Sequence, residues 1–255
     1  MDILDRFITQ AKENVASGYY SITDVVVATE EKISLKDTLN SKNFSLISEI
    51  KHASPAGEYS FDNINVEKTA TVFRNYGADA ISVVVEPKIF RGDLKHIPIA
   101  KKAGLPIVFK DFVLDERQIN AASAYGADCI LLVMKVIDRL NLNVDKLITL
   151  AHKNNLEVLL ECYDNEEMLR ATKTNADILG INNRDLQTLK VDLKRTTNIM
   201  NNLKELNKPV ISESGIKTRE DAEFVKASGV KGILVGTALW TANDQAAKIK
   251  ELTLK

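Results

Sequence analysis

Short runs rich in β-branched residues recur eight times between residues 44 and 236, and they constrain the fold more than any other feature. Most are nearly continuous apolar stretches, as expected for parallel strands that are covered on both faces. The runs cover residues 44–51, 79–86, 106–111, 128–134, 156–162, 178–183, 209–214 and 231–236. Segments such as 66–76, 116–125, 144–154 and 218–228 lie between them and carry apolar residues every three or four positions, as helices packed by one face do. The sequence therefore predicts alternating strands and helices.

A glycine or asparagine recurs just before every second run. Gly77 and Gly126 are 49 residues apart, Asn175 follows after 49 more, and Gly229 after a further 54. Each is expected to adopt the left-handed backbone that ends a helix. Eight strand–helix units predict an α/β fold, a single (β/α)8 TIM barrel, whose usual length is ~250 residues. An open, doubly wound sheet is the alternative, but residues 54–57 after the first run do not form a glycine-rich dinucleotide loop.

Residues 1–43 precede the first run and carry helical patterns of their own. A stripe of apolar residues with helical spacing consists of Ile3, Leu4, Phe7, Ile8, Ala11 and Val15, and residues 34–39 favour a second short turn. We expect an N-terminal helical extension that closes one end of the barrel. Because no linker or low-complexity stretch separates it, residues 1–255 are interpreted as one TIM-barrel domain, with 1–43 as the extension and 44–255 as eight βα units.

Charge and cysteine content exclude several classes of protein. The 34 Lys and Arg residues are balanced by 35 Asp and Glu, so no long-range field attracts nucleic acid or an acidic membrane. An anionic ligand must therefore be bound by local contacts. Cys129 and Cys162 lie in apolar runs and are expected to be buried free thiols in a reducing compartment. No apolar run approaches the ~20 residues that span a bilayer, so we expect a soluble, cytoplasmic protein.

Ionisable residues stand at the carboxyl ends of the odd-numbered runs: Glu49, Lys51, Lys110, Glu161 and Glu213. Charged side chains are almost never fully buried without a partner, and alternate strands of a (β/α)8 barrel supply each inward layer of four side chains. We therefore expect ammonium and carboxylate groups to face one another at the mouth where this fold places active sites. A buried ion-pair network without a catalytic task is the alternative interpretation.

Loops after the seventh and eighth runs contain Gly215 and Gly236. Barrels that bind phosphorylated substrates commonly hold the phosphate there, because bare backbone N–H groups can close on its oxygens. The sequence predicts a phosphate site in these loops, with Lys51 as an additional cation.

The remaining polar candidates carry less information. The sixth run ends in Asn182 and Arg184, which offer an amide and a guanidinium near the rim. His52, His96 and His152 have no metal-ligand spacing, and at least two of them are expected on the surface.

Seven motifs, in the same order, resemble the indole-3-glycerol phosphate synthase family. Residues 47–55 resemble its first-strand signature E-x-K-x-x-S-P, and the similarity runs from about residue 34 to the C-terminus. The other motifs are 82–86 with Phe90 and Gly92, then 110–112, 126–128 with 131–132, 160–161, 180–186 and 213–216. The chain departs from the family at Ala56, in Thr-Ala-Leu-Trp after Gly236, and in a helical N-terminus that matches only loosely.

The resemblance implies an enzyme of tryptophan biosynthesis. The family closes the ring of 1-(2-carboxyphenylamino)-1-deoxyribulose 5-phosphate with loss of CO2 and water, and it uses no metal or organic cofactor. Lys110 matches its general acid, and we expect burial beside a second ammonium to lower the pKa of this lysine. Glu161 and Lys51 match the residues of the dehydration stage, and the division of acid and base roles among the three stays open.

Further site residues are carried over from the same motifs. Three match positions that orient substrate hydroxyls and the lysines: Glu49, Asn182 and Glu213. Those implied to contact the substrate are Arg184 at the anthranilate carboxylate, Phe90 and Phe112 at the aromatic ring, Leu131, and, around the phosphate, Ser54, Ser214, Gly215, Gly236 and Thr237. The stretch 54–62 is the preferred lid. A phosphorylated small molecule is the expected partner, and association with other tryptophan-pathway enzymes is not specified by these residues.

Three other functions compete with this interpretation. A desolvated lysine is also the nucleophile of Schiff-base aldolases, which borohydride would trap on Lys110 or Lys51. A phosphoribosylanthranilate isomerase usually needs an acid–base Cys and Asp pair, and neither cysteine stands where that pair should be. A catalytically inactive sugar-phosphate-binding protein would keep the glycine loops, but it could lose Lys110 or Glu161, and both are present.

Overall fold

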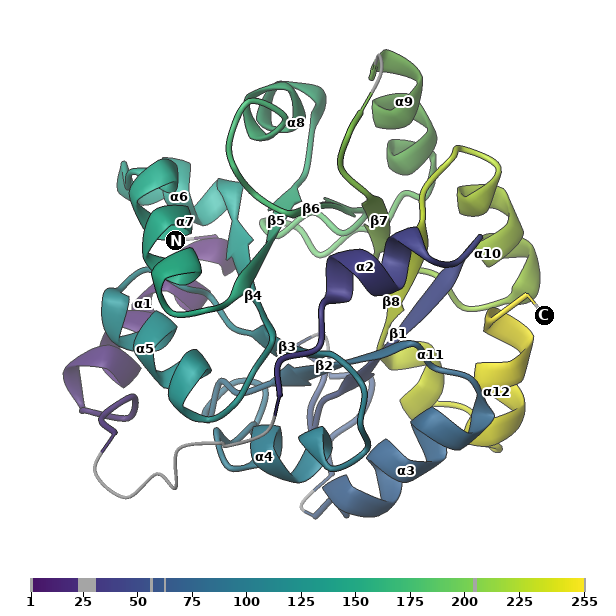
Figure 1. Ribbon diagram of the computed structural model, residues 1–255, viewed down its shortest axis with the longest axis horizontal. Coiled ribbons are helices and arrows are strands. Elements are labelled where there is room, and N and C mark those ends of the chain that lie inside the picture. Colours follow the sequence, from purple (N-terminus) through teal and green to yellow (C-terminus); the bar gives the residue numbers. More distant parts are fainter. Residues whose placement is uncertain (1, 23–30, 56, 62, 204–205, 255) are drawn as a thin grey trace.

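Eight parallel strands close into a barrel in the order β1 to β8, with β8 pairing back to β1 (Figure 1). The computed structural model describes residues 2–22, 31–55, 57–61, 63–203 and 206–254. The strands are β1 (Ser45–Ile50), β2 (Ala80–Val84), β3 (Ile107–Lys110), β4 (Cys129–Val133), β5 (Glu157–Cys162), β6 (Ile178–Asn182), β7 (Val210–Glu213) and β8 (Gly232–Val235). All eight predicted strands are present, and the (β/α)8 prediction is confirmed.

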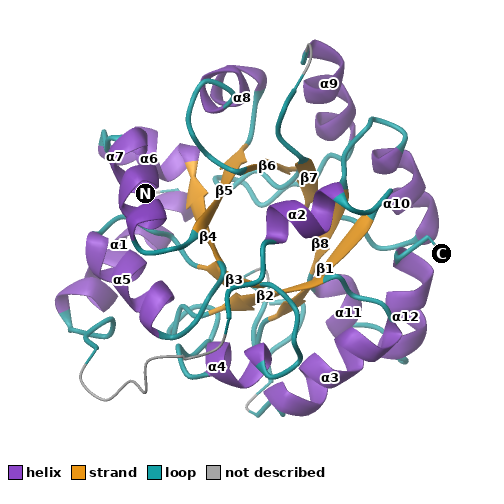
Figure 2. Ribbon diagram, in the orientation of Figure 1, coloured by secondary structure: helices purple, strands orange, loops and turns teal. Residues whose placement is uncertain are grey.

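Most of the helices surround the barrel as an outer ring, whereas α2 lies across its opening (Figure 2). They are α1 (Ile3–Ala16), α2 (Leu35–Asn40), α3 (Val66–Tyr76), α4 (His96–Lys101), α5 (Glu116–Ala124), α6 (Met134–Leu140), α7 (Val144–Lys153), α8 (Asn165–Ala171), α9 (Lys194–Asn202), α10 (Arg219–Lys226), α11 (Thr237–Trp240) and α12 (Gln245–Leu252). Among the described residues, no helix is both long enough and apolar enough to cross a membrane. Both cysteines are buried free thiols, as expected.

The barrel interior is packed by a layer of four apolar side chains from the odd strands: Ile47, Val108, Leu159 and Ile211. Successive side chains of a strand alternate between the two faces, so residues two positions further along also point inward. Those residues are Glu49, Lys110, Glu161 and Glu213, which form the next layer toward the carboxyl ends of the strands. Strand periodicity thus places the predicted charged layer directly above the apolar one.

The N-terminal extension reaches both ends of the barrel: α2 covers one end, as expected, and α1 packs beside the other. The backbone N–H of Leu35 in α2 donates to Glu157 Oε2 at 2.8 Å, at the amino end of β5, and α2 lies across the barrel opening in Figure 1. Helix α1 lies at the other end, because Asn14 Nδ2 donates to Glu86 Oε1 at 2.9 Å, just beyond β2. The Tyr20 hydroxyl, after α1, donates to Asp111 at the carboxyl end of β3.

Glycines end three of the four helices for which a left-handed residue was expected. Gly77, Gly126 and Gly229 have φ angles of 111°, 91° and 90°. The expectation for Asn175 is wrong, since this residue is not left-handed. Helix α8 ends earlier, at Ala171, and the hydroxyl of Thr174 donates to the Ala171 carbonyl at 2.8 Å. A side chain therefore satisfies the helix end where a left-handed backbone was predicted.

Candidate active site

A cavity opens at the carboxyl ends of the strands, and it brings together nearly all of the predicted site residues. Its lining includes Glu49, Lys51, Ser54, Phe90, Lys110, Phe112, Leu131, Glu161, Asn182, Arg184, Ser214, Gly215, Gly236 and Thr237. Glu213 is the exception, because it lies beneath Lys110 and is 1% exposed. Every strand end that carries a predicted site residue therefore contributes to one site.

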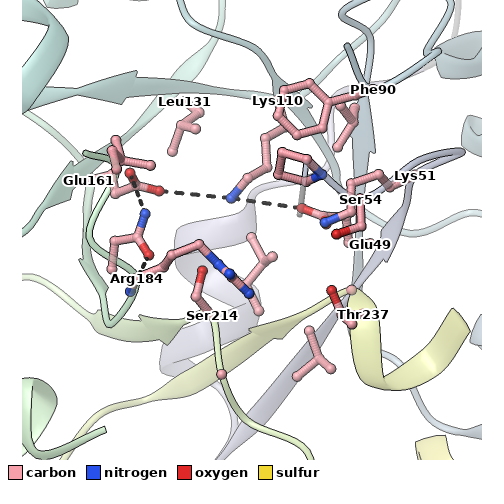
Figure 3. Close-up of a pocket in the computed structure, with 18 of the residues that line it drawn as sticks. Glu49, Lys51, Ser54, Phe90, Lys110, Leu131, Glu161, Arg184, Ser214 and Thr237 are labelled. Carbon is pink, nitrogen blue, oxygen red and sulfur yellow. Dashed lines mark hydrogen bonds and ion pairs between the residues drawn. The ribbon is translucent and has the colours of Figure 1, made fainter. Parts of the chain in front are cut away.

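The Lys110 ammonium is surrounded by three carboxylates. Its Nζ lies 2.6 Å from Glu213 Oε2 and 3.9 Å from both Glu49 Oε2 and Glu161 Oε2. Figure 3 shows Lys110 between Glu161 and Glu49, pointing into the cavity (Figure 3). All three carboxylates are almost fully buried, whereas the Lys110 side chain keeps 20% of its surface exposed. The lysine is therefore the most exposed member of the cluster, and Glu49 and Glu161 line the cavity beside it.

The expectation of a lowered pKa for Lys110 is wrong. Burial by itself lowers the pKa of this lysine, but the negative charges of Glu213, Glu49 and Glu161 outweigh burial and raise the pKa above its ordinary value. The second ammonium expected beside it belongs to Lys51, whose Nζ pairs with Glu49 Oε1 at 2.7 Å. The carboxylates thus favour the charged, proton-donating form of Lys110.

Glu161 is the group whose pKa lies close to neutrality. Burial, followed by the negative charge of Glu213, raises the pKa of Glu161 to about 8, although the Lys110 charge opposes this shift. Asn182 Nδ2 donates to Glu161 Oε1 at 2.9 Å and so fixes the carboxyl group. Among the described residues, Glu213 Oε1 has no hydrogen-bond partner. The arrangement suits Glu161 for gaining and losing a proton during a reaction.

Glu49 is the carboxylate that links the two lysines. Burial raises the pKa of Glu49, but the charges of Lys51 and Lys110 outweigh it, and the net shift is downward. The indole N–H of Trp240 donates to the Glu49 carbonyl at 2.8 Å. A Cβ on Gly236 would lie 2.3 Å from Glu49 Oε1, so only glycine leaves room for this carboxylate.

The loops after β7 and β8 face the cavity, on the side opposite Leu131 in Figure 3. Ser214 and Gly215 both have left-handed backbones, with φ angles of 66° and 83°. A Cβ on Gly215 would lie 2.2 Å from Val191 Cγ1, in the loop after β6. Glycine is therefore required here for two reasons, its φ angle and the close approach of a neighbouring loop.

Three phenylalanine rings form an apolar wall of the cavity. The Phe7 ring stacks on Phe112 with centroids 4.8 Å apart and lies 5.7 Å from Phe90. Phe90 and Phe112 were predicted at the aromatic end of the substrate, whereas Phe7 was assigned only to the apolar stripe of α1. Its spacing in that stripe signals burial and cannot distinguish a barrel core from a ligand pocket.

Two buried acidic residues of the cavity were not predicted as site residues. Glu86 and Asp111 line it, and both are held by groups of the N-terminal extension. Burial raises the pKa of Asp111 to about 6, although the Tyr20 hydroxyl opposes the shift. These contacts join the extension directly to the catalytic mouth.

The histidines differ from the expectation that most would be exposed. His52 is 5% exposed, and its ring stacks on His96 with centroids 4.8 Å apart, so only His152 is exposed. Within the described ranges, no group of three or more His, Cys, Asp and Glu side chains could hold a metal ion. The predicted lid, 54–62, includes Ala56 and Asp62, which lie outside the described residues. Ser54 in that stretch donates to Glu58.

Comparison with known proteins identifies the family. The family model for indole-3-glycerol phosphate synthase matches residues 4–252, so the similarity begins in α1 and not near residue 34 as expected. Indole-3-glycerol phosphate synthase from Caldanaerobacter subterraneus subsp. tengcongensis is 38% identical over 224 residues, which is 86% of this chain and 84% of that protein. The enzyme of the same name from Bacillus cereus is 36% identical over 245 residues, 95% of this chain and 94% of that protein.

A solved structure, thiamine phosphate pyrophosphorylase from Pyrococcus furiosus, shares the fold alone, with a TM-score of 0.57 and 21% identity over 86% of this chain and 96% of that one. The match to the family model, in contrast, spans nearly the whole chain and includes every strand that carries a charged residue to the cavity. The chain belongs to the indole-3-glycerol phosphate synthase family.

Proposed function

We propose that this chain converts 1-(2-carboxyphenylamino)-1-deoxyribulose 5-phosphate to indole-3-glycerol phosphate, with loss of CO2 and water, in tryptophan biosynthesis. The family match supports this carboxy-lyase activity. The observation that carries the proposal is the Lys110 ammonium, held among three carboxylates and exposed to the cavity. The protein acts as a single domain of residues 1–255 in the cytoplasm, on a phosphorylated small molecule.

In the first step, a ring carbon of the substrate attacks the ketone carbon, and the ketone oxygen gains negative charge. Lys110 is the group that donates a proton to this oxygen. The three carboxylates keep the lysine charged and fix its direction, so the donor is in place before the substrate arrives. Carbon dioxide then leaves, and the ring regains its aromaticity.

In the second stage, the hydroxyl takes a proton from Lys51 and leaves as water, and the ring carbon beside the nitrogen loses a proton, so the indole product keeps its N–H. Glu161, with a pKa of about 8, takes that proton. Lys51, paired with Glu49, assists the leaving hydroxyl and binds a substrate anion. Asn182 keeps Glu161 oriented. Mutation of Lys51, Lys110 and Glu161 one at a time is needed to assign the acid and base roles among them.

The two ends of the substrate are proposed to lie against opposite parts of the cavity. The phosphate binds the loops that contain Ser214–Gly215 and Gly236–Thr237, with Ser54 beside it. The anthranilate ring packs on Phe90 and Phe112, with Leu131 beneath, and Arg184 pairs with its carboxylate. All of these residues line the same cavity, which supports a single bound orientation.

The decisive experiment is a turnover assay with the purified protein and the carboxyphenylamino-deoxyribulose phosphate, read by the fluorescence of the indole product. Wild-type protein is expected to form product, and Lys110→Ala to lose turnover while it still binds substrate. Retained turnover in Lys110→Ala would remove the proposed acid. A covalent adduct after borohydride reduction with a keto sugar phosphate would instead favour a Schiff-base aldolase. The neutral amine that such chemistry needs is disfavoured by the carboxylates around Lys110.

A further inference from the structure

Asn183 is a completely buried residue directly after Asn182, and the reaction proposed above gives it no role. Its side-chain amide donates to Ser212 Oγ at 2.9 Å, to the Glu213 carbonyl at 3.0 Å and to the Ser214 carbonyl at 3.1 Å. Its backbone N–H also donates to the Glu213 carbonyl, at 2.9 Å. Asn183 therefore holds two consecutive carbonyl groups at the carboxyl end of β7.

The direction of these carbonyls fixes the direction of the neighbouring N–H groups. In a trans peptide, the C=O and the N–H of the following residue point to opposite sides, and the described chain contains no cis peptide. Because the carbonyls of Glu213 and Ser214 turn toward Asn183, the N–H groups of Ser214 and Gly215 turn away from it. Ser214 and Gly215 themselves line the cavity, so a ligand bound there would lie next to these N–H groups.

The backbone at Ser214 needs contacts that hold its conformation. Ser214 has a φ of 66°, a left-handed conformation that is uncommon for residues other than glycine. A residue keeps such a conformation only when its surroundings enforce it. The bond from Asn183 to the Ser214 carbonyl is a contact of this kind, and it comes from a side chain that no ligand displaces, because Asn183 is 0% exposed.

We propose that Asn183 is a positioning residue for phosphate binding. By holding the carbonyls of Glu213 and Ser214, it directs the N–H groups of Ser214 and Gly215 at the substrate phosphate. This inference rests on the proposed function, which puts the phosphate at that loop. Asn183 touches no substrate atom and acts only through the loop.

Thr196 in α9 sets the orientation of the Asn183 amide. Its hydroxyl is fully buried, donates to Asn183 Oδ1 at 2.8 Å and lies 2.7 Å from Ser212 Oγ. With Oδ1 facing this donor, the NH2 group of Asn183 faces the two carbonyls. The next residue, Thr197, offers a matched control, because its hydroxyl lies 2.9 Å from Ser228 Oγ and is separate from this network.

The test compares ligands with and without a phosphate. The substrate, its dephosphorylated form 1-(2-carboxyphenylamino)-1-deoxyribulose, and inorganic phosphate as a competitive inhibitor are measured with wild type and Asn183→Ala. We expect the variant to raise the KM of the substrate and the inhibition constant of inorganic phosphate by the same factor, about tenfold or more. The substitution removes the side-chain donor of both carbonyls and leaves only the backbone N–H of residue 183, which binds the Glu213 carbonyl. The KM of the dephosphorylated compound is expected to stay unchanged.

An equal rise in the KM of the substrate and of its dephosphorylated form would overturn the inference. Such a result would show that Asn183→Ala disturbs the site in general and not the binding of the phosphate. Wild-type turnover in the same assay tests the proposed function separately, so failure of one is distinguishable from failure of the other. If Asn183→Ala does not fold, the Thr196→Val variant is used to test the inference instead. Thr196→Val is expected to raise the inhibition constant of inorganic phosphate only about threefold, because the amide donors of Asn183 remain in place. Thr197→Val is expected to leave this constant unchanged. Equal effects of the two valine variants would also overturn the inference.

Discussion

Gly180→Ala tests whether catalysis depends on the contact between Lys110 and Glu213. A Cβ at position 180 would lie 2.3 Å from Glu213 Oε1 and 3.3 Å from Leu159 Cδ1. To reach an ordinary contact of 3.4 Å, the Glu213 carboxylate must retreat by about 1.1 Å. If Glu213 Oε2 moves by the same amount away from Lys110 Nζ, their contact lengthens from 2.6 Å to about 3.7 Å, beyond hydrogen-bond distance. Because displacements near 1 Å in an active site can cost about a hundredfold in rate, we expect kcat to fall by roughly that factor.

The assay is steady-state kinetics at saturating substrate, together with a thermal melt of each variant. Gly232→Ala is the matched control, since its Cβ would lie 2.7 Å from the Ser45 carbonyl, at the far end of the barrel. Both variants are overpacked and are expected to lose about 1–3 kcal/mol of stability, but only Gly180→Ala should lose kcat. A folded Gly180→Ala with wild-type kcat would refute the reasoning, as would an equal loss in Gly232→Ala.

Three further predictions concern the groups around the cavity. Asn182→Ala removes a hydrogen bond that lowers the pKa of Glu161, so the corresponding limb of the kcat/KM profile should move to higher pH, by about one unit, in a pH–rate measurement. Tyr20→Phe removes a donor to Asp111, whose pKa is about 6 in the folded protein against 3.8 for the free side chain. The free-energy cost of burying the charged carboxylate is absent below pH 4 and complete above pH 6. Urea denaturation of Tyr20→Phe should therefore show a larger loss in the free energy of unfolding, relative to wild type, at pH 7 than at pH 4, with about 1–3 kcal/mol lost at pH 7. Phe7→Ala should raise KM about tenfold with little change in kcat, because its ring contributes apolar contact, and an unchanged KM would exclude Phe7 from the site.

The location of the charged layer could be predicted because it depends only on local periodicity. Glu49 lies two residues after Ile47, and Glu161 two residues after Leu159, so a strand that buries the first residue of each pair directs the second to the same face. Parallel pairing then brings the strand ends to one mouth, whatever the details of the helices. The position of the loops that we propose to bind phosphate followed from the same topology, since the fold places the loops after β7 and β8 at this mouth.

Features that depend on contacts between distant segments could not be predicted. The upward shift in the pKa of Lys110 depends on the number of carboxylates within 4 Å, and the sequence does not give that number. Phe7 enters the cavity because α1 is anchored at Glu86, 72 residues from its partner Asn14. Asn175 was misplaced because the end of α8 is satisfied by a threonine hydroxyl, which competes with the left-handed turn.

The attachment of α1 has a consequence for biosynthesis of the chain. The ribosome releases this helix before its hydrogen-bonding partners are made, and the bond between Asp2 and Gln187 joins residues 185 positions apart. Such long-range contacts cannot form until most of the polypeptide has been translated. The start of α1 is therefore attached late, and a nascent chain truncated before Gln187 would hold this helix only by its contacts with earlier partners such as Glu86 and Phe112.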